Sequence, residues 1–336
     1  MNKVLCFGEL LMRLSPQLEG AWIRQNELPV FIGGAELNAA TGLANWGVPV
    51  SYFTALPHNY LSLEILESLT AKGIDVSKVQ FSGERIGTYY LPQGADLKNA
   101  GVIYDRAYSS FWNLQPGSID WDEVLSGVSW FNFSAITPAL NPNLAAVCLE
   151  AVKAASEKKI TVSVDLNYRS RLWQYGKQPA EVMPALVQHC DIIMGNVWAE
   201  AGMLGIETDP GLADEEAACL QQSARSSAAI MERFPRCRQV ANTFRFDRAN
   251  GLYYYATLFD GTRLFASKRH QTAQVIDRVG SGDTFMAGLI YGNLNKFDAQ
   301  EIIDFAAAAA FNKLFIKGDA TTASVEEIRN AYINYA

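Results

Sequence analysis

Short apolar runs alternate with stretches of helical periodicity along most of this chain. KVLCFGEL at 3–10 has the length of a strand, and the glycine turn that opens GGAELNAATGLANWG at 33–47 leads into a helical pattern. VSYFTAL at 50–56 predicts the next strand, and the amphipathic LSLEILESLTAKG at 61–73 predicts a helix that ends at Gly73. Strands that alternate with helices in this way indicate βα units and a mainly parallel sheet.

Three later strands are each predicted to end in polar residues. VSWFNFSAI, ITVSVDLN and CDIIMGN have the apolar character of buried strands, and helical stretches such as NLAAVCLEAVKAASEKK separate them. Their polar ends include Asp165, Asn167 and Asn196. Because ligands collect at the carboxyl ends of the strands in open α/β sheets, we expect these side chains to face a binding site.

Two segments break the alternation of strands and helices. Residues 13–32 and 85–110 mix polar and β-forming residues around turns. This pattern fits ordinary surface hairpins and also fits extra strands that project as a small flap. We expect the flap, which leaves residues 1–12, 33–84 and 111–336 for the α/β domain.

Composition and charge narrow the class of protein. The chain has 336 residues, of which 49% are hydrophobic and 19% charged, as is typical of a globular protein with a sizeable core. Its formal net charge of −7 argues against a general binder of nucleic acid or of anionic membranes. An anionic small ligand stays compatible with this charge, because a few local arginines outweigh a distant average.

The sequence favours a cytoplasmic protein without a membrane segment. Its five cysteines are odd in number and form no CxxC pair, as expected for reduced thiols. The most apolar late stretch, FAAAAAFNKLF at 305–315, is far shorter than the ~20 residues that cross a bilayer. Charged Glu9 and Arg13 follow the first apolar run too closely for a secretory signal.

The segment VIDRVGSGDTFMAGLIYG at 275–292 holds the most informative chemistry. Glycines at 280 and 282 allow a tight turn whose N–H groups converge at the start of a helix, which favours phosphate or developing negative charge. Asp283 in this corner suits a base that takes a proton from a substrate hydroxyl, worth ~10²–10⁴ in rate. Equally, Asp283 can be a helix N-cap worth ~1 kcal/mol.

The order of four motifs resembles the ribokinase-like (PfkB) family of ATP-dependent sugar kinases. GGAELN, VDLNYR, GN and DRVGSGD start at positions 33, 164, 195 and 277, and the likeness runs from about residue 3 to 330. The resemblance implies a doubly wound, mainly parallel α/β sheet flanked by helices, with a small β-sheet lid. It also implies that Asp283 is the catalytic base, that Asp277 is the upstream acid of the motif, and that the amides of Gly280, Ser281 and Gly282 form the anion hole.

Within the family, DLNYRSRLW, GGAELN, GTYYLPQG and YDRAYSS look most like 2-keto-3-deoxygluconate kinases. A sugar carboxylate needs a cation, and the planar fork of arginine suits it. A surface salt bridge for each arginine and lid packing for each tyrosine are the competing interpretations. The substrate-binding residues implied by the resemblance are Gly33, Gly34, Asn38, Tyr89, Tyr104, Arg106, Arg169 and Asp283.

For the nucleotide, the resemblance implies ATP with Mg²⁺ and leaves a monovalent cation open. The family's Asn-x-x-Glu is shifted here, because NVWAE places Glu200 one residue late for its contact with the metal through water. The family's usual glycine pair is missing from RQVANTFRFDRANGLYYYATL, where Asn242, Thr243 and Arg245 are the polar residues that could face a nucleotide. Arg278 replaces one of the family's threonines, and its side chain could point toward phosphate or toward solvent. The implied nucleotide-binding residues are Asn167, Asn196, Asp277, Gly280, Gly282 and Asn312.

Taken together, we expect a kinase that phosphorylates a primary hydroxyl of a sugar acid, with 2-keto-3-deoxy-D-gluconate and its 6-phosphate as the leading pair. The alternatives are a fructokinase or another neutral-sugar kinase of the same family, and a sugar-acid-binding homologue without turnover. Because flap sheets often bury an apolar face against a second subunit, we expect a homodimer or a higher homo-oligomer.

Overall fold

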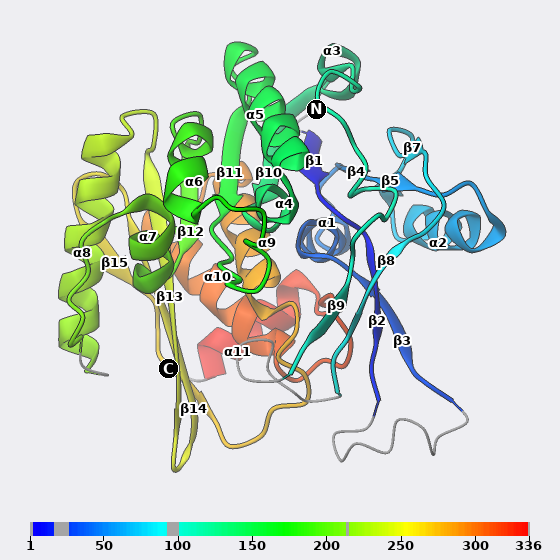
Figure 1. Cartoon of the computed structure of the whole chain (residues 1–336). Coiled ribbons are helices and arrows are strands. Elements are labelled where there is room, and N and C mark those ends of the chain that lie inside the picture. Colours follow the sequence, from blue (N-terminus) through cyan, green and yellow to red (C-terminus); the bar gives the residue numbers. More distant parts are fainter. Residues whose placement is uncertain (1–2, 17–26, 93–100, 213–214, 335–336) are drawn as a thin grey trace.

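The computed structural model describes residues 3–16, 27–92, 101–212 and 215–334. One large sheet crosses the molecule in the order β15-β14-β13-β12-β11-β10-β1-β4-β6, with β16 beside β14 (Figure 1). From β13 to β6 all neighbours are parallel, whereas β14 runs antiparallel to β13, β15 and β16. In this spatial order the strands are β15 Leu264–Ala266, β14 Gly251–Phe259, β13 Gln239–Arg248, β12 Ile192–Gly195, β11 Thr161–Asp165, β10 Val128–Ser134, β1 Lys3–Phe7, β4 Val50–Phe53 and β6 Ile74–Asp75, with β16 at His270–Thr272.

Helices cover both faces of this sheet, which buries its apolar strands on two sides (Figure 1). One face packs against α1 Ala35–Asn45, α2 Tyr60–Ala71, α9 Ser281–Leu294, α10 Ala299–Lys313 and α11 Val325–Asn334. The other face packs against α3 Trp121–Val124, α4 Ile136–Leu140, α5 Pro142–Glu157, α6 Pro179–Val187, α7 Val197–Leu204 and α8 Glu216–Arg233. Within the described ranges, no helix has the combination of length and apolar character that a bilayer span requires.

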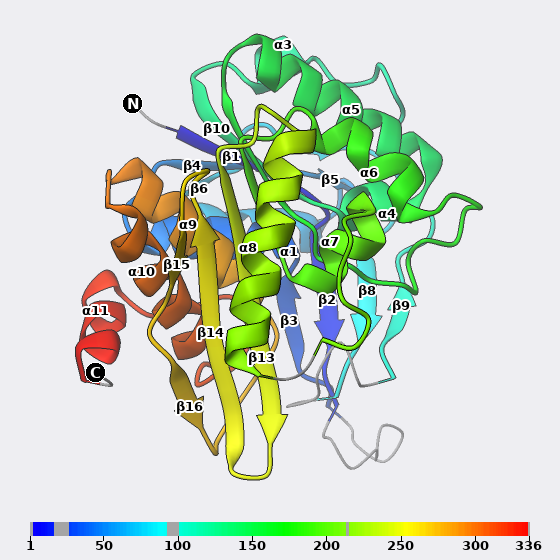
Figure 2. The same ribbon diagram turned by 90° about the vertical axis from the view of Figure 1, so that its left-hand side faces the viewer.

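A separate four-stranded sheet runs in the order β3-β2-β8-β9. Its strands are β3 Val30–Gly33, β2 Leu11–Leu14, β8 Gly87–Tyr90 and β9 Ile103–Asp105. These strands lie mostly within the two segments that interrupt the βα pattern, 13–32 and 85–110, but β2 begins at Leu11 and β3 ends at Gly33. Residues 17–26 and 93–100 of these segments lie outside the described residues. Figure 2 shows this small sheet and the long β13–β14 hairpin projecting from the same side of the molecule.

The fold class expected from the sequence is confirmed: a large, mostly parallel sheet lies between helices beside a small separate sheet. Two details differ from the pattern. VSYFTAL is divided, because β4 pairs with β1 whereas β5 Ala55–Leu56 pairs with β7 Gln80–Phe81 in a third, two-stranded sheet. One end of the main sheet is antiparallel, because β14 pairs antiparallel with β13 and with β15, and the sequence pattern did not predict this.

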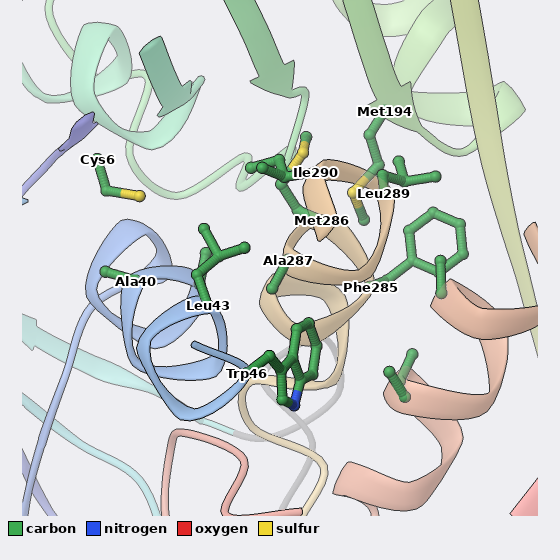
Figure 3. Close-up of a cluster of buried hydrophobic side chains, with 14 of the residues drawn as sticks. Cys6, Ala40, Leu43, Trp46, Met194, Phe285, Met286, Ala287, Leu289 and Ile290 are labelled. Carbon is green, nitrogen blue, oxygen red and sulfur yellow. The ribbon is translucent and has the colours of Figure 1, made fainter. Parts of the chain in front are cut away.

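Helix α9 packs against α1 on one face of the large sheet. Ala287 and its neighbours on α9 pack toward Ala40 and Leu43 of α1, with Trp46 at the end of that helix (Figure 3). The Trp46 indole donates a hydrogen bond to the Ala323 carbonyl at 2.9 Å, so its polar atom is also satisfied. This packing fixes the direction of α9 and therefore the position of its first turn.

Candidate active site

A cavity of about 540 Å³ opens between the small sheet and the large one. Its walls come from the small sheet, from the carboxyl ends of β11 and β12, from the β13–β14 hairpin and from the first turn of α9. This is the edge of the sheet at which α/β folds bind ligands. Of the residues expected from the sequence, the cavity is lined by Gly34, Asn38, Tyr89, Tyr104, Arg106, Asn167, Arg169, Asn196, Gly280, Ser281, Gly282 and Asp283.

The turn before α9 is shaped by Gly280. This residue is the N-cap of α9 with φ 79°, and a Cβ built on it would lie 1.7 Å from the Asp319 carbonyl oxygen. Glycine meets both demands because it has no side chain. The first hydrogen bond of the helix runs from Thr284 N to Gly280 O at 2.9 Å, so the N–H groups of residues 281–283 have no partner within the helix. Together with the helix dipole, N–H groups in this position favour negative charge.

Asp283 lies at the third position of α9, so the N-cap interpretation of this residue is wrong. Its carboxylate is half-buried, and Oδ2 accepts a hydrogen bond from Asn38 Nδ2 at 2.7 Å. Burial raises the pKa of Asp283 to about 7, and the negative charges of Asp165 and Glu36 add to this effect. The Asn38 hydrogen bond and the Arg169 charge act in the opposite direction. A carboxyl group with a pKa near neutrality is well matched to general base catalysis.

Asn38 is positioned by the glycine turn at the start of α1. Gly34 is the N-cap with φ 136°, and a Cβ there would lie 2.3 Å from the Glu9 carbonyl oxygen. This turn starts the helix with the Asn38 N–H donating to Gly34 O at 2.8 Å. The Asn38 amide donates to Asp283, whereas its Oδ1 is buried and has no hydrogen-bond partner within the described ranges. A buried acceptor without a partner is unfavourable, so Oδ1 is a ready acceptor for a ligand hydroxyl.

The two arginines expected at the substrate differ in their surroundings. Arg106 is buried, and its guanidinium contacts Glu9 Oε2 at 2.6 and 2.7 Å through Nη2 and Nε. Ser109 Oγ also donates to Glu9, at 2.5 Å. Arg169 is half-buried, its Nη1 donates to the Tyr168 carbonyl at 3.0 Å, and no carboxylate of the described residues pairs with it. Arg169 therefore brings to the cavity a charge that forms no ion pair with the carboxylates of the described residues.

The two tyrosines lie side by side on neighbouring strands. Tyr89 of β8 and Tyr104 of β9 are paired in register, and their ring centroids are 6.4 Å apart. The Tyr89 hydroxyl donates to Asp319 Oδ2 at 2.8 Å, and burial raises the pKa of this phenol well above its usual range. Each tyrosine thus both packs in the small sheet and lines the cavity.

Opposite the small sheet, the cavity reaches the ends of β11 and β12. Asn167 adopts φ 23°, an uncommon left-handed conformation that asparagine tolerates, and its N–H donates to Asp165 Oδ1 at 2.9 Å. Asn196 is the N-cap of α7, because its Oδ1 accepts from Ala199 N at 2.9 Å. Arg278 forms a two-pronged ion pair with Asp247 at 2.7 and 2.8 Å. The cavity also takes in Thr243, Arg245 and Tyr254 on the hairpin.

Four residues that the resemblance implied do not line this cavity. Gly33 and Asn312 lie outside its lining, and Asp277 is buried in an ion pair with Arg13. Glu200 lies on α7 and is fully buried, and its Oε1 accepts from Asn242 Nδ2 at 2.5 Å. One residue along a helix is a rotation of ~100°, so the shifted spacing turns this carboxylate into the protein interior. Burial raises its pKa to about 7.

Some lining residues were not anticipated from the sequence. Trp198 is 45% exposed and follows the polar end of β12 closely, and Tyr168 is 41% exposed beside Arg169. In the sequence, both aromatic residues follow a predicted polar strand end closely, and this pattern could have indicated that Tyr168 and Trp198 line the site. Arg171 also lines the cavity and donates to the Val102 carbonyl of the small sheet at 3.1 Å.

The donor set fits a magnesium nucleotide. Mg²⁺ is usually held by one or two carboxylates, several waters and the phosphates of its nucleotide. Asp165 and Asp283 supply carboxylates at the cavity, and Asn167 and Asn196 supply amide groups. Among the residues that the structure describes, no cluster of three or more His, Cys, Asp or Glu side chains could hold a metal by itself.

Comparison with known proteins identifies the class. The family model of the pfkB family carbohydrate kinases matches residues 1–324, and the chain belongs to this family. A crystal structure of 2-dehydro-3-deoxygluconokinase from Thermotoga maritima is 35% identical, with a TM-score of 0.89 over 99% of this chain and 100% of that one. The 2-dehydro-3-deoxygalactonokinase of Haloferax volcanii is 25% identical over 97% of this chain and 95% of its own length. A probable chloroplastic fructokinase of Arabidopsis thaliana is 23% identical over 85% of this chain and 69% of its own length.

The comparisons confirm the resemblance and the fold read from the sequence. The chain is a phosphotransferase with an alcohol group as acceptor, as its family defines.

Proposed function

We propose that this protein transfers the γ-phosphoryl group of ATP to a primary hydroxyl of a small sugar acid. The leading acceptor is 2-keto-3-deoxy-D-gluconate, with its 6-phosphate as product. The main support is Arg169, a guanidinium at the cavity that forms no ion pair with a carboxylate of the described residues. The two relatives with the broadest coverage reported above also carry the names of sugar-acid kinases, one for the gluconate and one for its galactonate epimer.

In this proposal Asp283 and the α9 turn carry the chemistry. The acceptor hydroxyl loses its proton to the Asp283 carboxylate while its oxygen forms a bond to the γ-phosphorus, and the bond between that phosphorus and the bridging oxygen of ADP breaks. The N–H groups at 281–283 stabilise the charge that spreads over the transferred group. Asn38 holds Asp283 in place through the 2.7 Å hydrogen bond and offers its Oδ1 to the acceptor.

The remaining side chains bind and orient. Arg169 pairs with the sugar carboxylate, Gly34 allows the sugar to approach the backbone, and Tyr89 and Tyr104 cover it. Mg²⁺ neutralises the phosphate oxygens when it is bound with ATP. Asp165, Asn167 and Asn196 are the cavity residues suited to it and to the nucleotide. Glu200 is buried away from the cavity, so we assign it no metal contact.

Residues 13–32 and 85–110, which include most of the small sheet, serve in this proposal as a lid that excludes water. A homodimer would cover the exposed apolar side chains at its edges, of which Val30 on β3 is 50% exposed and Ile103 on β9 is 56% exposed. Light scattering after gel filtration tests this, and a monomer at micromolar concentration would refute it.

A panel of acceptors with ATP and Mg²⁺ tests the function. We expect the highest kcat/KM with 2-keto-3-deoxygluconate or its C4 epimer 2-keto-3-deoxygalactonate, and much lower values with fructose and ribose. ADP release measures the rate, and NMR of the product locates the phosphate. A fructose kcat/KM equal to that of the sugar acids contradicts the proposal, as does tight sugar-acid binding without ADP release.

One observation favours a neutral-sugar kinase as the second candidate. Glu9 neutralises Arg106, so one of the two arginines expected at the carboxylate is already paired. Under this alternative Arg169→Ala leaves the kinetics with every acceptor unchanged. Under the main proposal the same variant loses activity with acids alone.

A further inference from the structure

A buried group of charged side chains joins the base of the small sheet to the turn before α9. Arg13 on β2 is completely buried, with Nη2 2.7 Å from Asp277 Oδ2 and Nε 2.8 Å from Asp319 Oδ1. Lys313, at the end of α10, is also completely buried and donates to the Ile316 carbonyl at 2.9 Å. We call Arg13, Asp277, Lys313 and Asp319 the lid–turn cluster.

On one side, the two carboxylates of the cluster hold the backbone around the anion-binding turn. Asp277 Oδ1 accepts from Val279 N at 3.1 Å, and its Oδ2 accepts from Gly318 N at 3.2 Å. The carbonyl of Asp319 occupies the space where Gly280 would carry a side chain. Movement of either carboxylate would therefore shift the residues directly before the first N–H groups of α9.

On the other side, three strands of the small sheet meet the cluster in one row. Arg13 on β2 is paired in register with Phe31 on β3 and with Tyr89 on β8. The Arg13 guanidinium lies 4.5 Å from the centre of the Phe31 ring, and the Tyr89 hydroxyl donates to Asp319 Oδ2 at 2.8 Å. Tyr89 also lines the cavity, so the same row of residues contacts both the cluster and the site.

The charges of the cluster balance, with two cations against two carboxylates. Burial lowers the pKa of Lys313 to about 8, although Asp277 and Asp319 act to raise it. Apolar residues of similar volume commonly replace a buried ion pair without loss of stability, so stability alone does not account for the cluster. The fork of Arg13 donates hydrogen bonds to Asp277, whereas its contact with Asp319 Oδ1 is an ion pair without hydrogen-bond alignment. One guanidinium thus holds two carboxylates at once, which a packed apolar core does not do.

We propose that the lid–turn cluster holds the small sheet at a fixed position relative to the turn before α9. In this proposal Arg13 is a positioning residue for phosphoryl transfer. The proposal rests on the phosphoryl transfer described above but not on the identity of the acceptor, because any sugar that the wild type phosphorylates can report on it. A displacement of about 1 Å in the site can reduce a rate by ~10²-fold, so a small movement of the sheet relative to the turn has a large effect on the rate.

Three variants separate positioning from stability. Arg13→Met leaves two buried carboxylates without their arginine and is expected to lower Tm by roughly 5–10 °C. The double variant Arg13→Met, Asp319→Asn removes one charge of each sign, so it regains stability without restoring the bridge. Arg236→Met is the matched control, because Arg236 pairs with Asp191 at 3.0 Å near the amino ends of β12 and β13, away from the cavity.

The kinetics are measured at a temperature at which circular dichroism shows every variant folded. We expect the double variant to lose at least about tenfold in kcat, with little change in KM for either substrate, because the turn acts on the transition state. The Arg236→Met control is expected to lower Tm with kcat unchanged. A double variant with the kcat of the wild type overturns the proposal, and so does a change confined to KM.

Amide hydrogen exchange gives a second result that needs no turnover. The Val279 and Gly318 amides, which donate to Asp277, should exchange faster in the double variant than in the wild type, by about tenfold or more. Unchanged exchange at both amides contradicts the proposal even if kcat falls. If the wild type phosphorylates no sugar, the proposed function fails, and hydrogen exchange still decides the role of the cluster.

Discussion

The pH dependence of the reaction follows from the surroundings of Asp283. This carboxyl group must be ionised to accept a proton, and its pKa in the folded protein is raised to about 7 from the usual 3.8. With that pKa, the ionised fraction rises from about one tenth at pH 6 to about nine tenths at pH 8. Because kcat/KM reports on the free enzyme, we expect it to increase about tenfold over this range.

Two variants show whether Asp283 causes this increase. Asp283→Asn should remove the dependence and lower kcat by ~10²–10⁴-fold. Glu36→Gln should move the increase to lower pH, because the Glu36 charge raises the pKa of Asp283. Glu36 is itself a buried carboxyl group whose pKa is raised to about 7, so the wild-type profile reports on both groups together.

The assay is ADP release with ATP and sugar both far below their KM values, so that the rate reports on the free enzyme, between pH 5.5 and 8.5, in buffers of constant ionic strength. Glu200→Gln is the control, since burial also raises the pKa of Glu200 to about 7 but this carboxyl group lies outside the cavity. Its profile should match that of the wild type. A flat profile above pH 5.5, as expected for an ordinary aspartate, would refute the reasoning, and so would an Asp283→Asn variant with full activity.

Three further predictions concern single residues. Arg169→Ala should lower kcat/KM for the sugar acid by about 10–150-fold, the equivalent of ~1.5–3 kcal/mol, and leave fructose unaffected; an equal loss with both sugars would contradict this. Glu200→Gln should raise the free energy of unfolding by up to about 3 kcal/mol at pH 8 and by far less at pH 5. Folded Glu200 keeps its proton up to about pH 7, so the wild-type protein loses stability as the pH rises from 4.5 to 7. Equal effects of the substitution at both pH values would refute this prediction. Gly47 has φ 75° and open space around it, so Gly47→Ala should lower the free energy of unfolding by roughly 1–2 kcal/mol and leave the kinetics normal. Gly280 has φ 79° and lies against a carbonyl, so Gly280→Ala should also abolish activity. Equal unfolding curves and equal rates for the two variants would contradict this prediction.

The sequence by itself determined the features that depend on neighbouring residues. The apolar runs and helical periods predicted the alternation of parallel strands and helices, and these strands placed Asp165, Asn167 and Asn196 at one edge of the sheet. Gly280 and Asp283 are part of one turn and one helix, so their spacing was enough to bring the anion-binding amides and a carboxylate together.

Only the tertiary structure decided how distant charges pair. Arg106 was expected at a substrate carboxylate, but Glu9, 97 residues earlier in the chain, neutralises it. Arg13 reaches Asp277 across 264 residues, and no local pattern indicates such a pair. Charge pairing depends on which side chains share a low-dielectric interior, and the packing of the whole chain creates that interior.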